Sequence, residues 1–256
     1  MTNRMNFQIK LAERVIEIQA LYDKVYTQCR KYRIPESLRE SPDIVIKVTQ
    51  EELEQEQSQG MQFAEEASDR SEYDPANAEC VLVCRKIANA MLPFDTILMH
   101  GVCIAAEGRG YIITAPSGVG KSSRAFLWLE SMPDARIING DKPLIRFAKD
   151  SVYAYGTPWA GKERLTLNQS VPVQAIFLLE RSREKDELLV EKLNIGDALP
   201  FLIQQTYLGE DIASMQKTIR LLYSLKDTVR LFRFRSEQTV EAVQLAYAVA
   251  RPGSDT

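Results

Sequence analysis

The pattern of apolar and polar positions divides the chain into two parts of different character. In the first part, residues 5–20 alternate and predict one or two strands, and residues 43–48 predict another. Residues 21–33 predict a short helix, and residues 75–91 place apolar side chains on one face of a longer helix. We therefore expect a small N-terminal α+β lobe over residues 1–92.

A capping box predicts the start of a polar helix within this lobe. Thr49 is followed three residues later by Glu52, the spacing at which the two side chains cap each other's backbone N–H groups. Residues 51–74 are strongly acidic, with Arg70 as the one basic residue. Such a run is most often a solvated helix and loop, and the alternative is a docking surface for a basic partner.

The second part, residues 93–256, contains short strands in quick succession. Strands are predicted over residues 96–99, 102–106, 111–114, 136–138, 144–147, 152–155, 175–180, 188–191 and 229–235. Helices are predicted over residues 121–131, 195–207, 211–225 and 236–249. This order lacks a regular βαβ repeat, so we expect a mixed sheet and not a doubly wound parallel one.

A glycine-rich loop joins one of these strands to a helix. It reads Ala115-Pro116-Ser117-Gly118-Val119-Gly120-Lys121-Ser122, with alanine in place of the usual first glycine. Backbone N–H groups in such a loop form a nest for anions, and the helix dipole adds to the attraction. The residues assigned to ATP phosphates are Ser117, Gly118, Val119, Gly120, Lys121, Ser122 and Ser123.

Two residues of this loop have separate expected roles. Lys121 would reach the β- and γ-phosphates, and the hydroxyl of Ser122 would bind Mg²⁺. The alternative is a strand-to-helix turn that only looks like this motif.

His100 and Asp141 are the polar residues spaced to reach the loop. His100 follows the strand 96–99, where a lone histidine is otherwise more often structural. Asp141 follows the strand 136–138, where P-loop enzymes hold a magnesium-bound water or a general base. Asn-Gly-Asp-Lys-Pro is also turn chemistry, so a turn and a functional role are both open.

The segment 156–164 is the other unusual stretch. It is rich in glycine and carries Trp159, Lys162 and Arg164. The two cations could meet phosphate or an acidic substrate, with the aromatic ring as a pocket wall. A surface loop with incidental charges is the alternative.

Composition and charge narrow the class of protein. The net charge is −3 and no basic face is concentrated, so we expect no nucleic-acid partner. The first residues lack an apolar signal core, and no run of about 18 apolar residues follows, so we expect no membrane span and a cytoplasmic location. Of four cysteines only Cys80 and Cys84 lie close in sequence, and buried thiols are favoured over a metal site.

These residues together resemble the catalytic domain of HPr kinase/phosphorylase and its phosphoenolpyruvate-carboxykinase-like relatives. The resemblance runs from His100-Gly101-Val102 through the glycine-rich loop to Asp141. In that family the histidine, the loop and an aspartate pair share one active site, which implies roles for His100 and Asp141. This chain has Gly140 where the family often has a second carboxylate, so Asp141 would serve as both base and metal ligand.

A closer resemblance, over most of the length, is to small bacterial HPr serine kinase-like proteins. The matching segments include Asp141-Lys142-Pro143-Leu144, Gly156-Thr157-Pro158-Trp159, Leu179-Glu180-Arg181 and Gln204-Gln205-Thr206-Tyr207. The loop motif of HPr kinases downstream of the aspartate pair is not found, and the segment around Trp159 stands in its place. The acceptor therefore stays open.

The resemblance implies a mixed-sheet, carboxykinase-type P-loop core over residues 93–256 and a Mg²⁺- and ATP-dependent kinase. The acceptor would be a hydroxyl, on a serine of a protein or peptide or on a small molecule. Asp141, assisted by His100, would take its proton, and Lys162 or Arg164 would neutralise the transferred group or fix the acceptor. The family also hints at a homo-oligomer.

Two other functions are kept as alternatives. One is an ATP-binding regulator without fast catalysis, for which the single carboxylate at 140–141 leaves room. The other, least favoured, is carboxykinase-type chemistry, which needs a larger metal and substrate apparatus.

Overall fold

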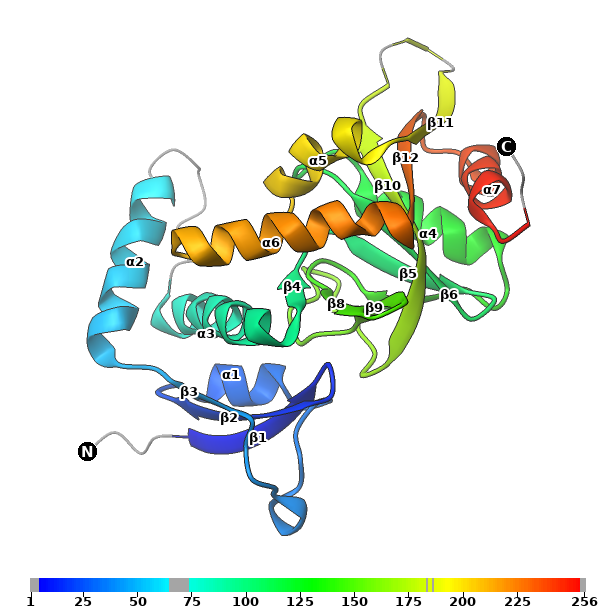
Figure 1. Cartoon of the computed structure of the whole chain (residues 1–256). Coiled ribbons are helices and arrows are strands. Elements are labelled where there is room, and N and C mark those ends of the chain that lie inside the picture. Colours follow the sequence, from blue (N-terminus) through cyan, green and yellow to red (C-terminus); the bar gives the residue numbers. More distant parts are fainter. Residues whose placement is uncertain (1–4, 65–73, 183, 186, 254–256) are drawn as a thin grey trace. The chain divides into compact units, whose positions relative to one another are not determined.

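The computed structural model describes residues 5–64, 74–182, 184–185 and 187–253. The chain divides into two compact units, Met1–Ala90 and Met91–Thr256 (Figure 1). Each unit is described by itself below, because each has its own elements and its own buried apolar residues.

The first unit contains a three-stranded sheet and three α-helices in its described part. The strands are β1 (Met5–Leu11), β2 (Arg14–Ala20) and β3 (Ile44–Lys47), in the order β1-β2-β3. The first pair is antiparallel and the second parallel. The helices are α1 (Asp23–Gln28), α2 (Gln50–Ala64) and α3 (Pro75–Met91). The predicted strands and the helix over 75–91 are confirmed.

The capping box at the start of α2 is confirmed as well. Thr49 N–H donates to Glu52 Oε2 at 2.9 Å, and Glu52 N–H donates to Thr49 Oγ1 at 3.2 Å. Most of the acidic run beyond α2 falls on residues 65–73, which lie outside the described residues, so neither of its two interpretations is tested.

The predicted helix over 21–33 is too long. Helix α1 ends at Gln28, and the chain then turns back to the sheet, where Tyr32 O accepts from Lys10 N at 2.9 Å and Ile34 N donates to Gln8 O at 2.8 Å. These long-range backbone bonds replace the helical ones that the local pattern favours.

All four cysteines are buried free thiols. Burial raises the pKa of Cys103 to about 12, so its thiolate is not populated near neutral pH. Among the described residues there is no group of three or more His, Cys, Asp or Glu side chains that could hold a metal ion. The described helices are all too short or too polar to span a bilayer.

The second unit is built on one mixed sheet, nine-stranded in the described residues. Its strands are β4 (Thr96–Leu98), β5 (Val102–Ala106), β6 (Arg109–Thr114), β7 (Arg136–Asn139), β8 (Leu144–Ala148), β9 (Ser151–Tyr155), β10 (Ser170–Glu180), β11 (Leu188–Leu193) and β12 (Arg230–Ser236). The order is β4-β8-β9-β10-β6-β5-β7, with β12 paired to β10 and β11 to β12. Only β10 makes parallel pairs, with β6 and β12, and the other neighbours are antiparallel. The prediction of a mixed sheet is confirmed.

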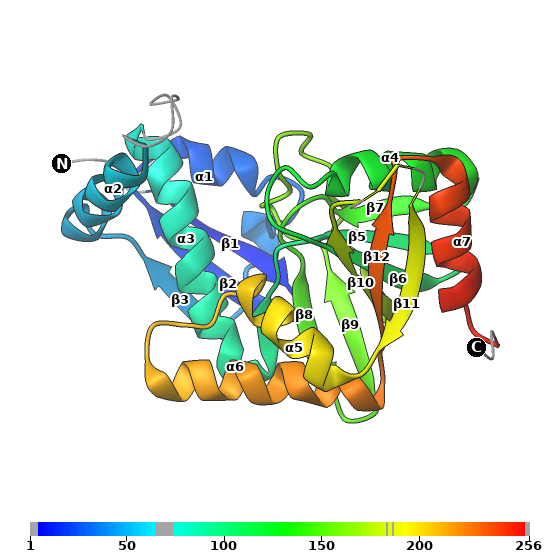
Figure 2. The same cartoon turned by 90° about the horizontal axis from the view of Figure 1, so that it is seen from above.

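Helices cover both faces of this sheet (Figure 2). On one face, residues of α5 (Ile195–Gln204) and α6 (Ile212–Ser224) share a hydrophobic cluster with Ile112 and Ile176. On the other face, α4 (Lys121–Ser131) and α7 (Val240–Ala250) pack with Tyr111 and Phe177. Strands buried on both faces explain the nearly continuous apolar runs at 111–113 and 175–179.

Three predicted boundaries miss by three residues or more in this unit. The helix predicted over 195–207 ends at Gln204, because Thr206 forms a bridge with Met99. Strand β10 begins at Ser170, before the predicted 175, because Ser170, Val171 and Pro172 pair with β9. Helix α7 begins at Val240, after the predicted 236, because Thr239 caps it by accepting from Ala242 N at 3.2 Å.

Candidate functional site

One edge of the second unit's sheet collects the chain segments of the predicted site. Strand β10 is parallel to both β6 and β12, so Thr114, Glu180 and Ser236 all end at this edge. Strand β5, antiparallel to β6, begins there, and β7, antiparallel to β5, ends there. The glycine-rich loop after β6, His100 before β5 and Asp141 after β7 therefore lie at a common edge, the usual place for ligands in open α/β sheets.

The backbone of the glycine-rich loop depends on two of its glycines. Gly118 and Gly120 have left-handed φ angles of 76° and 100°, which favour glycine. Gly120 is the N-cap of α4 and no side chain caps the helix. The first N–H groups of α4 are thus left for an anion. Ser117 is exposed, and Ser122 and Ser123 are half-buried in the first turn.

The side chain of Lys121 is folded back over this loop. It is 8% exposed, and its Nζ donates to Ala115 O at 2.8 Å and to Pro116 O at 3.2 Å. Burial lowers the pKa of Lys121, while the nearby charge of Asp141 works in the opposite direction. The ammonium group is therefore placed at the loop and within electrostatic range of Asp141.

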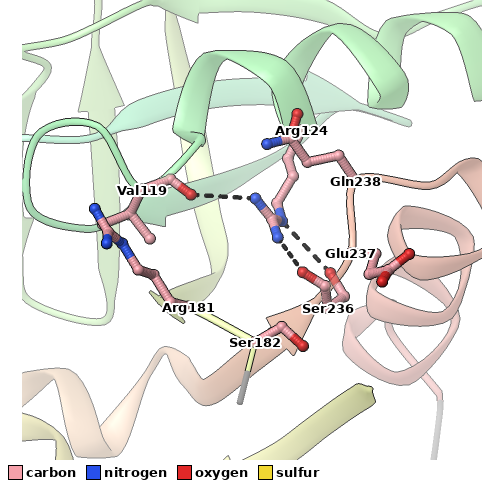
Figure 3. Close-up of a pocket in the computed structure, with 7 residues that line it drawn as sticks. All are labelled: Val119, Arg124, Arg181, Ser182, Ser236, Glu237 and Gln238. Atoms are coloured by element: carbon pink, nitrogen blue, oxygen red, sulfur yellow. Dashed lines mark hydrogen bonds between the residues drawn. The ribbon is translucent and has the colours of Figure 1, made fainter. Parts of the chain in front are cut away.

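Arg124 ties the loop to the end of β12, a contact that the sequence did not suggest. The side chain is 3% exposed. Its Nη1 donates to Val119 O and Gly120 O, both at 3.4 Å, Nη2 donates to Ser236 O, and Nε lies 3.4 Å from Ser236 Oγ. Figure 3 shows the guanidinium between the two segments. Arg124 bonds both to the loop and to Ser236, which lies 112 positions further along the chain. It therefore fixes the loop at this edge of the sheet.

Replacing Arg124 with methionine is expected to lower the free energy of unfolding by about 3 kcal/mol, because buried carbonyl groups would lose a charged donor. Urea denaturation followed by circular dichroism measures this change. Arg136→Met, at an exposed arginine of the same unit, is the control and should stay within about 0.5 kcal/mol of the wild type. Equal losses in the two variants would contradict the structural role of Arg124.

His100 and Asp141 are in direct contact. His100 Nε2 lies 3.3 Å from Asp141 Oδ1, and Lys142 Nζ contacts Oδ2. The backbone joins the two segments, since Gly101 N donates to Asp141 O at 2.8 Å. Burial of the carboxyl acts to raise its pKa, but the hydrogen bond from His100 and the charge of Lys142 outweigh it and lower the pKa of Asp141 to about 2. Asp141 is therefore ionised at neutral pH.

Asn139 holds the turn that carries Asp141. Its Oδ1 accepts from Asp141 N at 2.9 Å and from Lys142 N at 2.6 Å, while its Nδ2 donates to Thr157 O and Oγ1, both at 3.1 Å. The turn interpretation of this sequence is thus present in the structure, and the same turn presents Asp141 to His100. The only sequence signal for Asn139 was its place before Gly-Asp.

The segment 156–164 packs against this turn through its backbone. Trp159 is 8% exposed, so its ring is buried, and its carbonyl accepts from Lys142 N at 3.2 Å. A Cβ at Gly140 would lie 2.7 Å from Ala160 O, and a Cβ at Gly161 would lie 3.3 Å from Asp141 Cβ. Position 140 therefore has no room for a second carboxylate.

The two cations of this segment lie at its surface. Lys162 and Arg164 are both exposed, one and three residues after Gly161, and Arg164 has a left-handed φ of 52°. Because Gly161 lies against Asp141, both cations are carried by the loop that covers the Asp141 turn.

A cavity of about 410 Å³ lies on the side of the glycine-rich loop that faces away from the Asp141 turn (Figure 3). It is lined by Val119, Arg124, Arg181, Ser182, Ser236, Glu237 and Gln238. In the strand order, β10 and β12 carry this cavity on one side of β6, whereas β5 and β7 carry His100 and Asp141 on the other. The loop therefore lies between this cavity and the His100–Asp141 pair.

These features define a mixed α/β protein with a glycine-rich loop and a His100–Asp141 pair at one edge of its sheet. No protein-family model matches the chain, and no curated protein is similar to it in sequence. Among solved structures, its backbone is similar to that of the HPr(Ser) kinase/phosphatase from Coxiella burnetii, at 11% identity and a TM-score of 0.33, over 58% of this chain and 91% of that one. At this identity and score the similarity says nothing about activity.

Proposed function

We propose that this protein is a Mg²⁺- and ATP-dependent kinase that transfers the γ-phosphoryl group to a hydroxyl acceptor. The observation that supports it best is the placement of a glycine-rich anion nest beside a contacting His100–Asp141 pair. A nest with a lysine binds phosphates, and an ionised carboxylate in hydrogen-bonded contact with a histidine can accept a proton.

The order of groups along the sheet edge supports one direction for the nucleotide in this proposal. The triphosphate would lie on the loop N–H groups and on Lys121, which is within electrostatic range of Asp141. The γ-phosphate would then point towards Asp141, and the nucleoside towards the cavity beside Val119 and Gln238. The volume of about 410 Å³ is within the range of small-molecule pockets.

Asp141 would act as the base. As the acceptor oxygen forms its bond to the γ-phosphorus, the bond from that phosphorus to the β,γ-bridging oxygen breaks, and ADP leaves with that oxygen. The hydroxyl proton passes to the carboxylate of Asp141. A carboxyl of low pKa is a weak base, which suffices because positioning and charge stabilisation supply most of the catalysis in phosphoryl transfer.

Mg²⁺ would be held by the hydroxyl of Ser122 and the carboxylate of Asp141. The donor set fits, because Mg²⁺ prefers oxygen ligands and takes its remaining positions from water and phosphates. When bound, the ion would neutralise charge on the β- and γ-phosphates. Since position 140 has no room for a second carboxylate, Asp141 would serve both as the base and as a magnesium ligand. Lys162 or Arg164 would neutralise the transferred group or fix the acceptor.

The proposal is tested by incubating the pure protein with Mg²⁺ and γ-³²P-ATP, with free serine, free threonine or a cell extract as acceptor. We expect label on an acceptor, none with α-³²P-ATP, and none after addition of EDTA. Calorimetry with ATP is run in parallel. ATP binding without any label transfer would favour the ATP-binding regulator, and absence of ATP binding would exclude both functions.

A further inference from the structure

The side chain of Gln205 contacts the ring of His100 at the end opposite to Asp141. Gln205 Oε1 lies 3.1 Å from His100 Nδ1, and Asp141 Oδ1 lies 3.3 Å from Nε2. The ring is therefore held between an amide at one nitrogen and a carboxylate at the other. Gln205 reaches this place from the end of α5, 105 positions along the chain from His100.

The backbone holds Gln205 in this place independently of its side chain. The carbonyl of Gln205 accepts a hydrogen bond from His100 N at 2.7 Å. The neighbouring residues Met99 and Thr206 pair with each other in an antiparallel β-bridge. The Gln205 side chain is 7% exposed. A substitution at 205 can thus remove the amide and leave the backbone connection in place.

The contact with Asp141 decides which ring nitrogen carries hydrogen. The ionised carboxylate of Asp141 only accepts hydrogen bonds, so the nitrogen that faces it, Nε2, must carry the hydrogen. In the neutral ring Nδ1 is then an acceptor. The amide of Gln205 can match it, because a half-turn about its last torsion exchanges oxygen for the NH₂ group. An apolar side chain cannot do this.

We infer that Gln205 is a positioning residue that keeps the His100 ring from turning, so that the Nε2–H set by Asp141 stays directed at the carboxylate of Asp141. The inference rests on the proposed function, in which Asp141 takes the proton of the attacking hydroxyl. His100 orients the carboxylate, and Gln205 prevents the ring from turning away from it. Hydrogen-bonded partners of a histidine commonly fix the orientation of the ring in this way.

The chain's single histidine makes the tautomer measurable without assignment. The variant is Gln205→Met, which keeps the length of the side chain and removes the amide. The control is Gln204→Met, at the adjacent exposed glutamine. The ring ¹⁵N shifts are recorded at one pH at which the ring is neutral. We expect the Nε2–H tautomer in the wild type and in Gln204→Met. In Gln205→Met we expect a mixture of tautomers, because the ring can then turn away from Asp141.

The kinetic result should agree with the spectra. Gln205→Met is expected to lower kcat for label transfer roughly tenfold to a hundredfold, with the KM for ATP unchanged because the loop is not altered. An unchanged tautomer in Gln205→Met overturns the inference. If that variant fails to fold by circular dichroism, Gln205→Leu takes its place under the same criterion. The spectra need no turnover, so a wild type without label transfer would overturn the proposed function and not the role of Gln205.

Discussion

Asp141→Asn is expected to lower label transfer from ATP by roughly 10²- to 10⁴-fold, the range for removal of a general base. Asparagine has the shape of aspartate, and the turn that presents it depends on Asn139 Oδ1 and on backbone N–H groups. The geometry of the site should therefore persist while the proton acceptor is lost. Initial rates with γ-³²P-ATP at saturating Mg²⁺ measure the effect.

The control for this variant is Asp150→Asn, at an exposed aspartate in the turn between β8 and β9. It should transfer label at the wild-type rate. Calorimetry with ATP in the absence of Mg²⁺ should give similar affinities for wild type and Asp141→Asn, because the nest and Lys121 hold the phosphates. Label transfer by Asp141→Asn at the wild-type rate would exclude Asp141 as the base.

Local sequence was enough to predict the glycine-rich loop and its helix. The loop depends on residues next to each other, since Gly118 and Gly120 adopt left-handed backbone and α4 begins at Lys121, as predicted. The strands of the mixed sheet were also predictable from short apolar runs. The order of the strands in the sheet was not predictable. Strand β10 pairs in parallel with β6, which precedes it in the sequence, and with β12, which follows it.

The residues that sequence reasoning missed act through long-range contacts. Gln205 meets His100 across 105 positions, and Arg124 meets Ser236 across 112. Neither contact has a spacing signature, because each exists only after the sheet has brought distant segments together. The strand that precedes His100 does not pair with β6, the strand before the glycine-rich loop. Strand β4 pairs with β8, and His100 O instead accepts from Thr114 Oγ1 at 2.7 Å.

Lys121→Ala is expected to weaken ATP binding about 100-fold, which corresponds to about 2.8 kcal/mol for the loss of a buried charged partner. The ammonium of Lys121 now donates to the carbonyl groups of Ala115 and Pro116, close to where the phosphates would lie. Phosphate oxygens are stronger acceptors than these carbonyls, because they are charged. Calorimetry with ATP measures the affinity, with Lys149→Ala at an exposed lysine as the control.

The same variant separates ligand binding from fold stability. Burial lowers the pKa of Lys121 and so disfavours its charge, which opposes the two hydrogen bonds of the ammonium group. Removing the side chain should therefore change the melting temperature little without ATP and abolish its rise with ATP. A large loss of stability without ATP would assign Lys121 a structural role. Full ATP affinity in Lys121→Ala would mean that the loop is a strand-to-helix turn and not a nucleotide site.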